Sequence, residues 1–142
     1  MEKNVVITIN SVQSVDGNKL DSPELVTQGK YSLVGDEISL SYMESKLTGM
    51  EGTKTAFIVR PDEVVLRRRG TVNSQMVFRK GEKHTFFYET RYGALTLGLD
   101  THRIEHSLGE HGGDMEIEYD LDFEKAMVSR NKFIINVREM KS

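Results

Sequence analysis

The segment 63-EVVLRRRGTVNSQMVFRKGEKHTFFYETRYGALTLGLD-100 decides the fold of this chain. It divides into four short runs separated by glycines at Gly70, Gly81 and Gly93. Valine, threonine, phenylalanine and tyrosine favour extended strands, and glycine marks the tight turns between them. The segment therefore predicts four antiparallel strands joined as consecutive hairpins.

Alternation of apolar and polar residues extends from this segment toward both ends of the chain. It is clearest in 115–123, where Met115, Ile117 and Tyr119 alternate with acidic residues. A helix would scatter these apolar positions around its circumference, whereas a strand places them all on one face. The region 3–15 alternates in the same way. No segment predicts a convincing amphipathic helix, and the best candidate, Asp122–Val128, would form at most one or two turns.

About ten strands with turns at regular spacing predict a sandwich or a barrel. Consecutive hairpins without long crossovers favour an all-β fold: a single closed or nearly closed antiparallel up-and-down barrel, which also removes exposed strand edges. The 142 residues fit one domain, 1–142. A barrel of this size encloses either a filled core or room for one small ligand.

Composition excludes several classes of function. The chain has no cysteine, which removes disulfides, thiolate chemistry and cysteine-ligated zinc. The net charge of −3 argues against a nucleic-acid binder. No apolar run approaches the roughly 18 residues of a membrane span, and the N-terminal residues do not resemble a signal peptide. We therefore expect a cytoplasmic protein with no membrane partner, and the sequence carries no cofactor motif.

The segment His102-Arg103-Ile104-Glu105-His106 matches the H-x-x-E-H pattern of some metalloproteases. That chemistry requires a helix, where histidines four residues apart share a face. The surrounding alternation indicates a strand, on which these residues lie about 13 Å apart. Because zinc–nitrogen bonds are about 2.0–2.1 Å long, the sequence predicts no metal site here.

Several predicted strands place one polar side chain on their apolar face. Arg68 follows Val64 and Leu66 in phase, whereas Arg67 and Arg69 point to solvent. The candidate ligand-binding residues selected in this way are Tyr42, Glu44, Arg68, Tyr88, His106 and Tyr119. A buried charge requires a partner, so two interpretations stay open. One is an internal Arg68–Glu44 ion pair completed by tyrosine hydroxyls, and the other is a set of anchors for a ligand in a barrel cavity.

Five segments carry a family resemblance through their order and spacing. They are 40-LSYME-44, 64-VVLRRRG-70, 75-QMVF-78, 88-YETRYGALTL-97 and 117-IEYDL-121. Across Asn4 to Arg138 the chain resembles the YwiB-like family, a domain of unknown function with a lipocalin-like (calycin) β-barrel. The resemblance implies a barrel and a cavity, and it implies no reaction.

These features are consistent with three functions. The leading hypothesis is a non-enzymatic barrel that binds a small ligand with an anionic or polar head near Arg68. The alternative is a protein–protein interaction module with a packed core that self-associates, for example as a homodimer. An enzyme using Glu44, Arg68 and a tyrosine is the third, although no residue is assigned a catalytic role. An accessible cavity favours ligand binding, and a packed core with Arg68 fully paired favours the interaction module.

Overall fold

Period-two alternation produces a sheet of eleven strands in the computed structural model, which describes residues 2–21 and 24–140. The strands are β1 (Glu2–Val15), β2 (Asn18–Asp21), β3 (Leu25–Val34), β4 (Glu37–Met43), β5 (Lys54–Arg60), β6 (Glu63–Arg69), β7 (Asn73–Phe78), β8 (Lys83–Thr90), β9 (Gly93–His106), β10 (Gly112–Phe123) and β11 (Ala126–Glu139). A short 3-10 helix, η1 (Lys46–Thr48), lies between β4 and β5.

The sheet closes on itself through its first and last strands. From β3 to β11 each strand pairs with the next, and β11 returns to pair with β1 from Val5↔Glu139 to Ser14↔Arg130. Residues 2–9 of β1 pair with β3, and residues 12–15 of β1 pair with β2. Thus β1 and β3–β11 form a closed antiparallel ten-stranded barrel, with β2 as an added strand. The predicted all-β, up-and-down barrel is confirmed.

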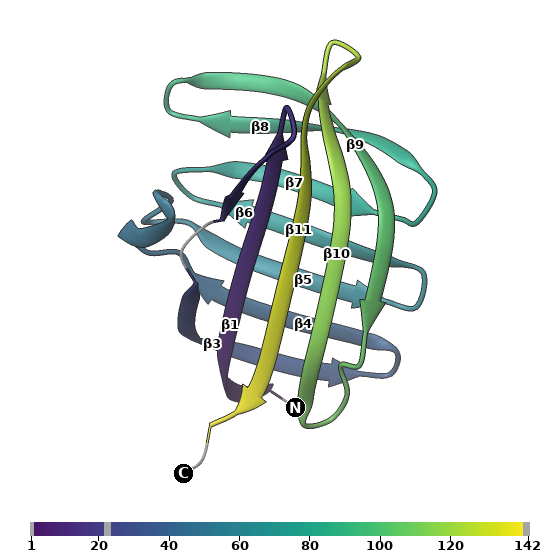
Figure 1. Cartoon of the computed structure of the whole chain (residues 1–142). Helices are drawn as coiled ribbons and strands as arrows, with labels where there is room; N and C mark the ends of the chain where they lie inside the picture. The colour runs from purple at the N-terminus through teal and green to yellow at the C-terminus, as the bar shows by residue number, and fades with distance from the viewer. Residues whose placement is uncertain (1, 22–23, 141–142) are drawn as a thin grey trace.

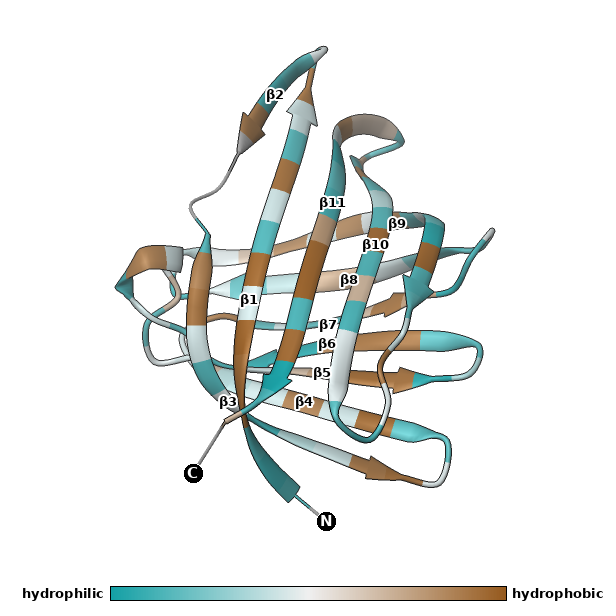
Figure 2. Cartoon of the chain, turned by 60° about the horizontal axis from the view of Figure 1, so that its bottom comes forward, coloured by the Kyte–Doolittle hydropathy of each residue, from teal (hydrophilic) through white to brown (hydrophobic). Residues whose placement is uncertain are grey.

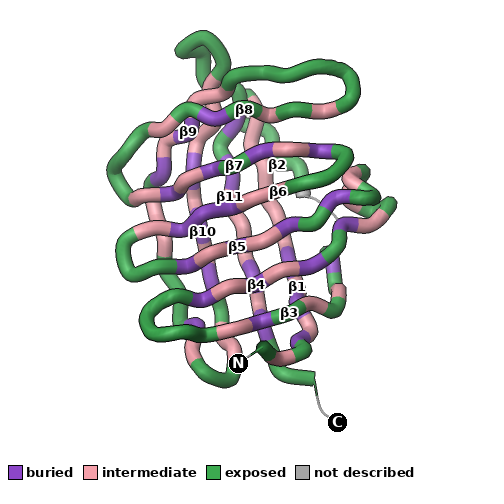
Figure 3. Tube along the Cα trace, turned by 180° about the vertical axis from the view of Figure 1, so that it is seen from behind, coloured by how far each residue is buried: buried purple, intermediate pink, exposed green. Residues whose placement is uncertain are grey.

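The strands form two crossing layers. In Figure 1, β1, β10 and β11 run lengthwise at the front, and β4 to β7 cross behind them. Apolar and polar residues alternate along several strands, most clearly β1 and β10 (Figure 2), and the apolar faces meet inside the barrel. The tube in Figure 3 shows the same alternation as bands of buried and less buried residues.

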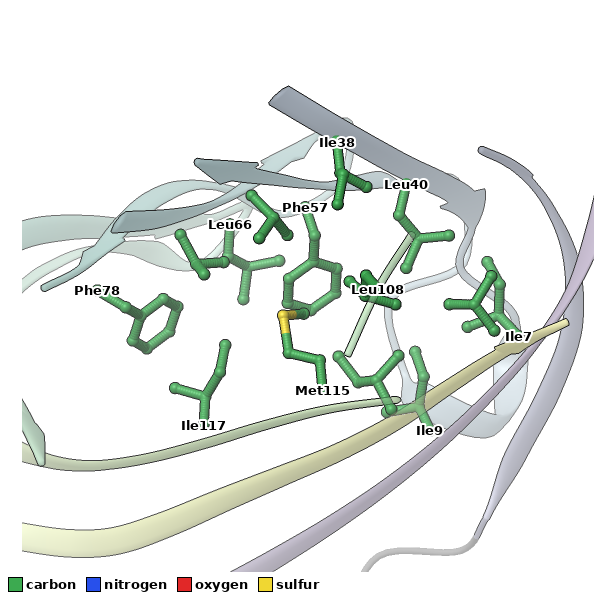
Figure 4. Close-up of a cluster of buried hydrophobic side chains, with 14 of the residues drawn as sticks. Ile7, Ile9, Ile38, Leu40, Phe57, Leu66, Phe78, Leu108, Met115 and Ile117 are labelled. Atoms are coloured by element: carbon green, nitrogen blue, oxygen red, sulfur yellow. The ribbon is translucent and has the colours of Figure 1, made fainter. Parts of the chain in front are cut away.

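One half of the barrel, on the side where both termini lie, is filled by side chains. This packed half contains Ile7, Leu40, Phe57, Leu66, Met115 and Ile117, each no more than 1% exposed (Figure 4). The hydroxyl of Tyr31 donates a hydrogen bond to the carbonyl oxygen of Gly109 at 2.6 Å, which ties the 107–112 loop against β3. Burial of this cluster supplies the main stabilisation of the fold.

The barrel wall is weakly joined between β7 and β8. These strands pair only at Asn73↔Glu89 and Ser74↔Tyr88. The loop after β7 instead bonds to β9, where the Gly81 amide donates to the Thr101 carbonyl at 3.0 Å. The β8–β9 hairpin therefore diverges from β7 beyond the first two residue pairs.

Two local features were left open by the alternation of the sequence. The segment Asp122–Val128 contains no helical turn; it forms the β10–β11 hairpin, with Glu124 and Lys125 at φ 51° and 68°. The register between β10 and β9 shifts between Glu118 and Tyr119 of β10, so that His102 of β9 has no direct partner there. The His102 side chain lies on the outer face, where its Nε2 is 2.7 Å from Asp120 Oδ2. Within the described residues, no helix is long and apolar enough to span a bilayer.

Gly70 is required by the close approach of the β6–β7 turn to the loop before β5. Its φ is +141°, and a Cβ there would overlap the carbonyl oxygen of Gly52 and lie 2.8 Å from Thr53 Cα. We expect Gly70→Ala to lower the free energy of unfolding by about 3 kcal/mol or more, measured by urea denaturation. Gly81→Ala is the matched control: φ is +79° with no atom within 4 Å, so only the backbone cost of about 1–2 kcal/mol applies. Equal losses of unfolding free energy in the two variants would contradict the close approach of Gly70 to Gly52 and Thr53.

Candidate functional site

A row of polar side chains crosses five neighbouring strands on the inner face of the barrel. The register pairs Tyr42 with Thr55, Thr55 with Arg68, Arg68 with Ser74, and Ser74 with Tyr88. Directly opposed residues share a face and lie about 4.5–5.5 Å apart at Cβ, so these five form one continuous row. We call Tyr42, Thr55, Arg68, Ser74 and Tyr88 the polar row.

Glu44 joins the polar row next to Arg68. It follows Tyr42 by two residues, and its amide donates to the Thr53 carbonyl at 2.8 Å, which keeps its side chain turned inward just beyond the end of β4. The Glu44 side chain is 1% exposed and that of Arg68 is 12% exposed. Thr55 Oγ1 donates a hydrogen bond to Glu44 Oε2 at 2.5 Å.

The Arg68–Glu44 pair has unused hydrogen-bonding capacity. Arg68 Nε lies 3.9 Å from Glu44 Oε2, which is too long for a hydrogen bond. Among the described residues, Arg68 Nε and Glu44 Oε1 are buried without a hydrogen-bond partner, and so is Ser74 Oγ. An unpaired buried polar atom costs roughly 1–3 kcal/mol. The pair therefore neutralises charge but leaves a donor and an acceptor available.

Two tyrosines beside the pair remain neutral at physiological pH. Burial raises the pKa of Tyr42, and the Glu44 carboxylate raises it further, against the opposing charge of Arg68. Burial also raises the pKa of Tyr119, again opposed by Arg68. The Tyr119 ring packs edge-on against Phe78, at 5.0 Å between centroids, and so covers the end of the packed half.

Above the polar row the barrel is hollow. A cavity of about 600 Å³, the main cavity, has Arg68 and Tyr119 in its wall. Its apolar lining includes Met76, Phe86, Leu97, Leu121, Val128 and Phe133. Leu95, Phe123 and Val128 line its mouth and are partly exposed, on the β8–β9 and β10–β11 hairpins (Figure 1). An apolar space with few polar groups is the usual form of a small-molecule site.

A second space, the side chamber, adjoins the main cavity. Its volume is about 210 Å³, and Ser11, Arg68 and Phe133 line both spaces. Tyr42 and Glu44 line only the side chamber, which is bordered by Leu47 and Thr48 of η1. Arg68 therefore stands between an apolar space and a smaller space with a carboxylate.

The structure brings together five of the six residues selected from the sequence. Tyr42, Glu44, Arg68, Tyr88 and Tyr119 all line one or both of the two spaces. The grouping of His106 with them is wrong. His106 lies exposed at the end of β9, and its Nδ1 accepts a hydrogen bond from the Leu108 amide at 3.2 Å. Because β9 ends at His106, alternation with the inward residues before it does not place the His106 side chain inside the barrel.

Sequence reasoning missed Thr55 and Ser74, although both share the phase of buried neighbours. Ser74 alternates with Met76 and Phe78, which would have identified it. The phase of β5 is ambiguous because apolar residues occupy both faces; Phe57 and Val59 face inward, which places Thr55 beside Glu44. The outward assignment of Arg67 is confirmed, since its Nε donates to Gln75 Oε1 on the surface at 3.1 Å.

The described residues were also compared with the ligand sets that hold metal ions. Across residues 2–21 and 24–140, no three His, Cys, Asp or Glu side chains gather closely enough to hold an ion. His102 and His106 do not share a site, because His102 contacts Asp120 on the outer face and His106 lies at the end of β9.

Comparison with known proteins identifies related barrels. The family model described as "Domain of unknown function (DUF1934)" matches residues 7–135. The chain is 31% identical over 120 residues to "Uncharacterized beta-barrel protein YwiB" of Bacillus subtilis (strain 168), covering 84% of this chain and 82% of that protein. The crystal structure of the YwiB protein from Bacillus subtilis aligns with a TM-score of 0.87 at 26% identity, over 99% of this chain and 94% of that chain. The resemblance indicated by the sequence is confirmed.

Loss of the Arg68 guanidinium should destabilise the fold. Arg68→Ala leaves the Glu44 carboxylate buried without its counter-charge, and we expect a loss of about 3–5 kcal/mol in the free energy of unfolding, measured by urea denaturation. Arg67→Ala, at the next position but on the outer face, should cost less than about 0.5 kcal/mol. A loss below about 0.5 kcal/mol for Arg68→Ala would contradict the burial of the pair.

The buried tyrosines should make the fold sensitive to alkali. In the unfolded chain Tyr42 and Tyr119 ionise near pH 10, whereas their folded-state pKa is higher. Above about pH 10 the unfolded state therefore holds fewer protons than the folded state, and the free energy of unfolding falls as pH rises. Tyr119→Phe should reduce this fall, measured as the urea midpoint at about pH 7 and about pH 10.5. Tyr92→Phe, at an exposed position, is the control. An equal change in the pH dependence of both variants would contradict a raised folded-state pKa of Tyr119.

Proposed function

This chain belongs to the DUF1934 family, and we propose that it binds a small, mainly apolar ligand in the main cavity of its barrel. The ligand's body contacts the apolar wall, and its polar end lies next to Arg68. Binding in this position removes apolar surface of both partners from water. Each Å² of apolar surface buried contributes about 25 cal/mol of favourable free energy. The proposal concerns reversible binding and not a reaction.

The contrast between the two halves of the barrel carries this proposal. Side chains such as Phe57 and Leu66 fill the packed half, as a purely structural core requires. Beyond the polar row the same barrel contains about 600 Å³ of space, within the usual range of ligand pockets. A barrel that serves only as a rigid surface gains nothing from an unfilled interior, because cavities lower stability.

The polar groups beside the cavity support binding more than catalysis. Tyr42 and Tyr119 hold their protons at neutral pH, because burial raises the pKa of both phenols. Glu44 accepts a hydrogen bond from Thr55 and lies behind Arg68, outside the lining of the main cavity. A general base must reach the proton that it removes, and this arrangement favours recognition of a polar group instead.

Self-association is a second candidate, supported by exposed apolar side chains around the mouth. Leu95, Phe123, Met127 and Val128 are each between 39% and 64% exposed. Two copies meeting at this rim would cover these side chains, since exposed apolar patches mark contact sites. Light scattering over a range of protein concentrations tests it, and Met127→Lys should shift any dimer toward the monomer.

Blocking the main cavity tests the leading proposal. We expect the neutral fluorophore N-phenyl-1-naphthylamine to bind with a large gain in emission, and Leu121→Trp, which fills the cavity from β10, to weaken binding at least tenfold. Thr96→Trp adds the same ring on the outer face of β9 and should leave binding unchanged. Native mass spectrometry of the gently purified protein should show a bound mass that leaves on denaturation. Absence of fluorophore binding to the wild type would contradict the proposal.

A further inference from the structure

The charge balance around Arg68 restricts the ligand. Resting on the binding function proposed above, we infer that the ligand's polar head is uncharged and carries both a hydrogen-bond donor and an acceptor, as an alcohol or a primary amide does. This inference replaces the anionic head that Arg68 alone would indicate. It follows from three observations: the charged residues of the two spaces, the low exposure of the Arg68–Glu44 pair, and the two unpaired atoms.

Among the described residues, the charged groups directed into the two spaces balance each other. Among the described lining residues, only Arg68, Glu44 and Lys132 carry charge. The Lys132 ammonium is directed to the outer face, where it lies 3.6 Å from Glu118 Oε1 and 3.8 Å from Glu116 Oε1. Inside the barrel one guanidinium therefore faces one carboxylate, beside phenols that are neutral.

A charged head would disturb this balance. A carboxylate or phosphate placed against Arg68 would give two negative charges for one positive charge, with Glu44 only 1% exposed. An ammonium placed against Glu44 would create the opposite excess. Uncompensated charge in a buried site is strongly unfavourable, whereas a neutral head leaves the Arg68–Glu44 balance intact.

The unpaired atoms indicate what the neutral head must offer. Within the described parts of the chain, Arg68 Nε is a donor without an acceptor, and Glu44 Oε1 is an acceptor without a donor. A hydroxyl group both donates and accepts, and a primary amide has two donor hydrogens and one acceptor oxygen. Either head can accept from Arg68 and donate to Glu44 at the same time.

Access to both atoms requires a rotation of the Arg68 side chain. Neither atom is in contact with solvent, but Arg68 lines both the main cavity and the side chamber, and the chamber's 210 Å³ gives its side chain room. The separation of 3.9 Å between Arg68 Nε and Glu44 Oε2 shows that no hydrogen bond holds the pair in its present position. A head group entering from the main cavity can therefore be placed between them.

A matched series of eight-carbon ligands tests the inference. We would measure displacement of N-phenyl-1-naphthylamine from the wild-type protein at neutral pH by 1-octanol, octanamide, octanoate and octylamine. The chains are alike, so differences report the head group. We expect octanol and octanamide to bind at least tenfold more tightly than octanoate and octylamine.

Removing the Glu44 charge should change this order. In Glu44→Gln the Arg68 charge has no counter-ion, so octanoate should gain at least tenfold in affinity relative to octanamide. Glu105→Gln removes the same charge from the outer face, where Glu105 pairs with Arg103, and should leave the order unchanged. This comparison separates local charge balance from the net charge of the protein.

The outcomes separate the inference from the proposed function. Tightest binding of octanoate or octylamine to the wild type would overturn the neutral head and leave ligand binding in place. Equal affinity for all four ligands would also overturn it, and would indicate that water satisfies Arg68 and Glu44. Failure of the fluorophore and of every ligand to bind would instead overturn the function itself.

Discussion

Closure of the sheet between β1 and β11 is the constraint on which the rest of the structure depends. Once the two strands pair from Val5 to Ser14, every inward residue of the barrel faces a common interior. The fold then has to fill that interior or line it. It does both, with a packed half near the termini and a hollow half beyond the polar row.

The polar row lies at the boundary between these halves. Arg68 is tolerated there because Glu44 supplies a counter-charge. A fully packed barrel would have little reason to keep a guanidinium on an apolar face, since apolar replacement of a buried ion pair is often neutral or stabilising. The pair is therefore best explained by the space beside it.

Alternation along the sequence predicted the strands, the closed barrel and the orientation of three consecutive arginines. It placed Arg68 and Glu44 on the inner face and offered an ion pair between them as one of two interpretations, and the structure brings the two side chains within 3.9 Å of each other. It failed for His106, since phase alone does not show that a strand has reached its end. The place and size of the cavity and the register shift near His102 were not predictable, because both depend on how neighbouring strands are offset and not on the residues of one strand.

The short β7–β8 pairing leaves unpaired strand edges in this barrel, which closure of the sheet removes elsewhere. Beyond Ser74 and Tyr88, the facing sides of β7 and β8 have no ladder partner among the described residues, so this part of the wall contains two free strand edges. Free edges invite a strand from another molecule, which is a route to aggregation. Charged side chains border this opening, among them Arg67, Arg69 and Glu89. They would have to lose hydration if a foreign strand were added, so the solubility of the barrel depends on charges that contribute little to its folding.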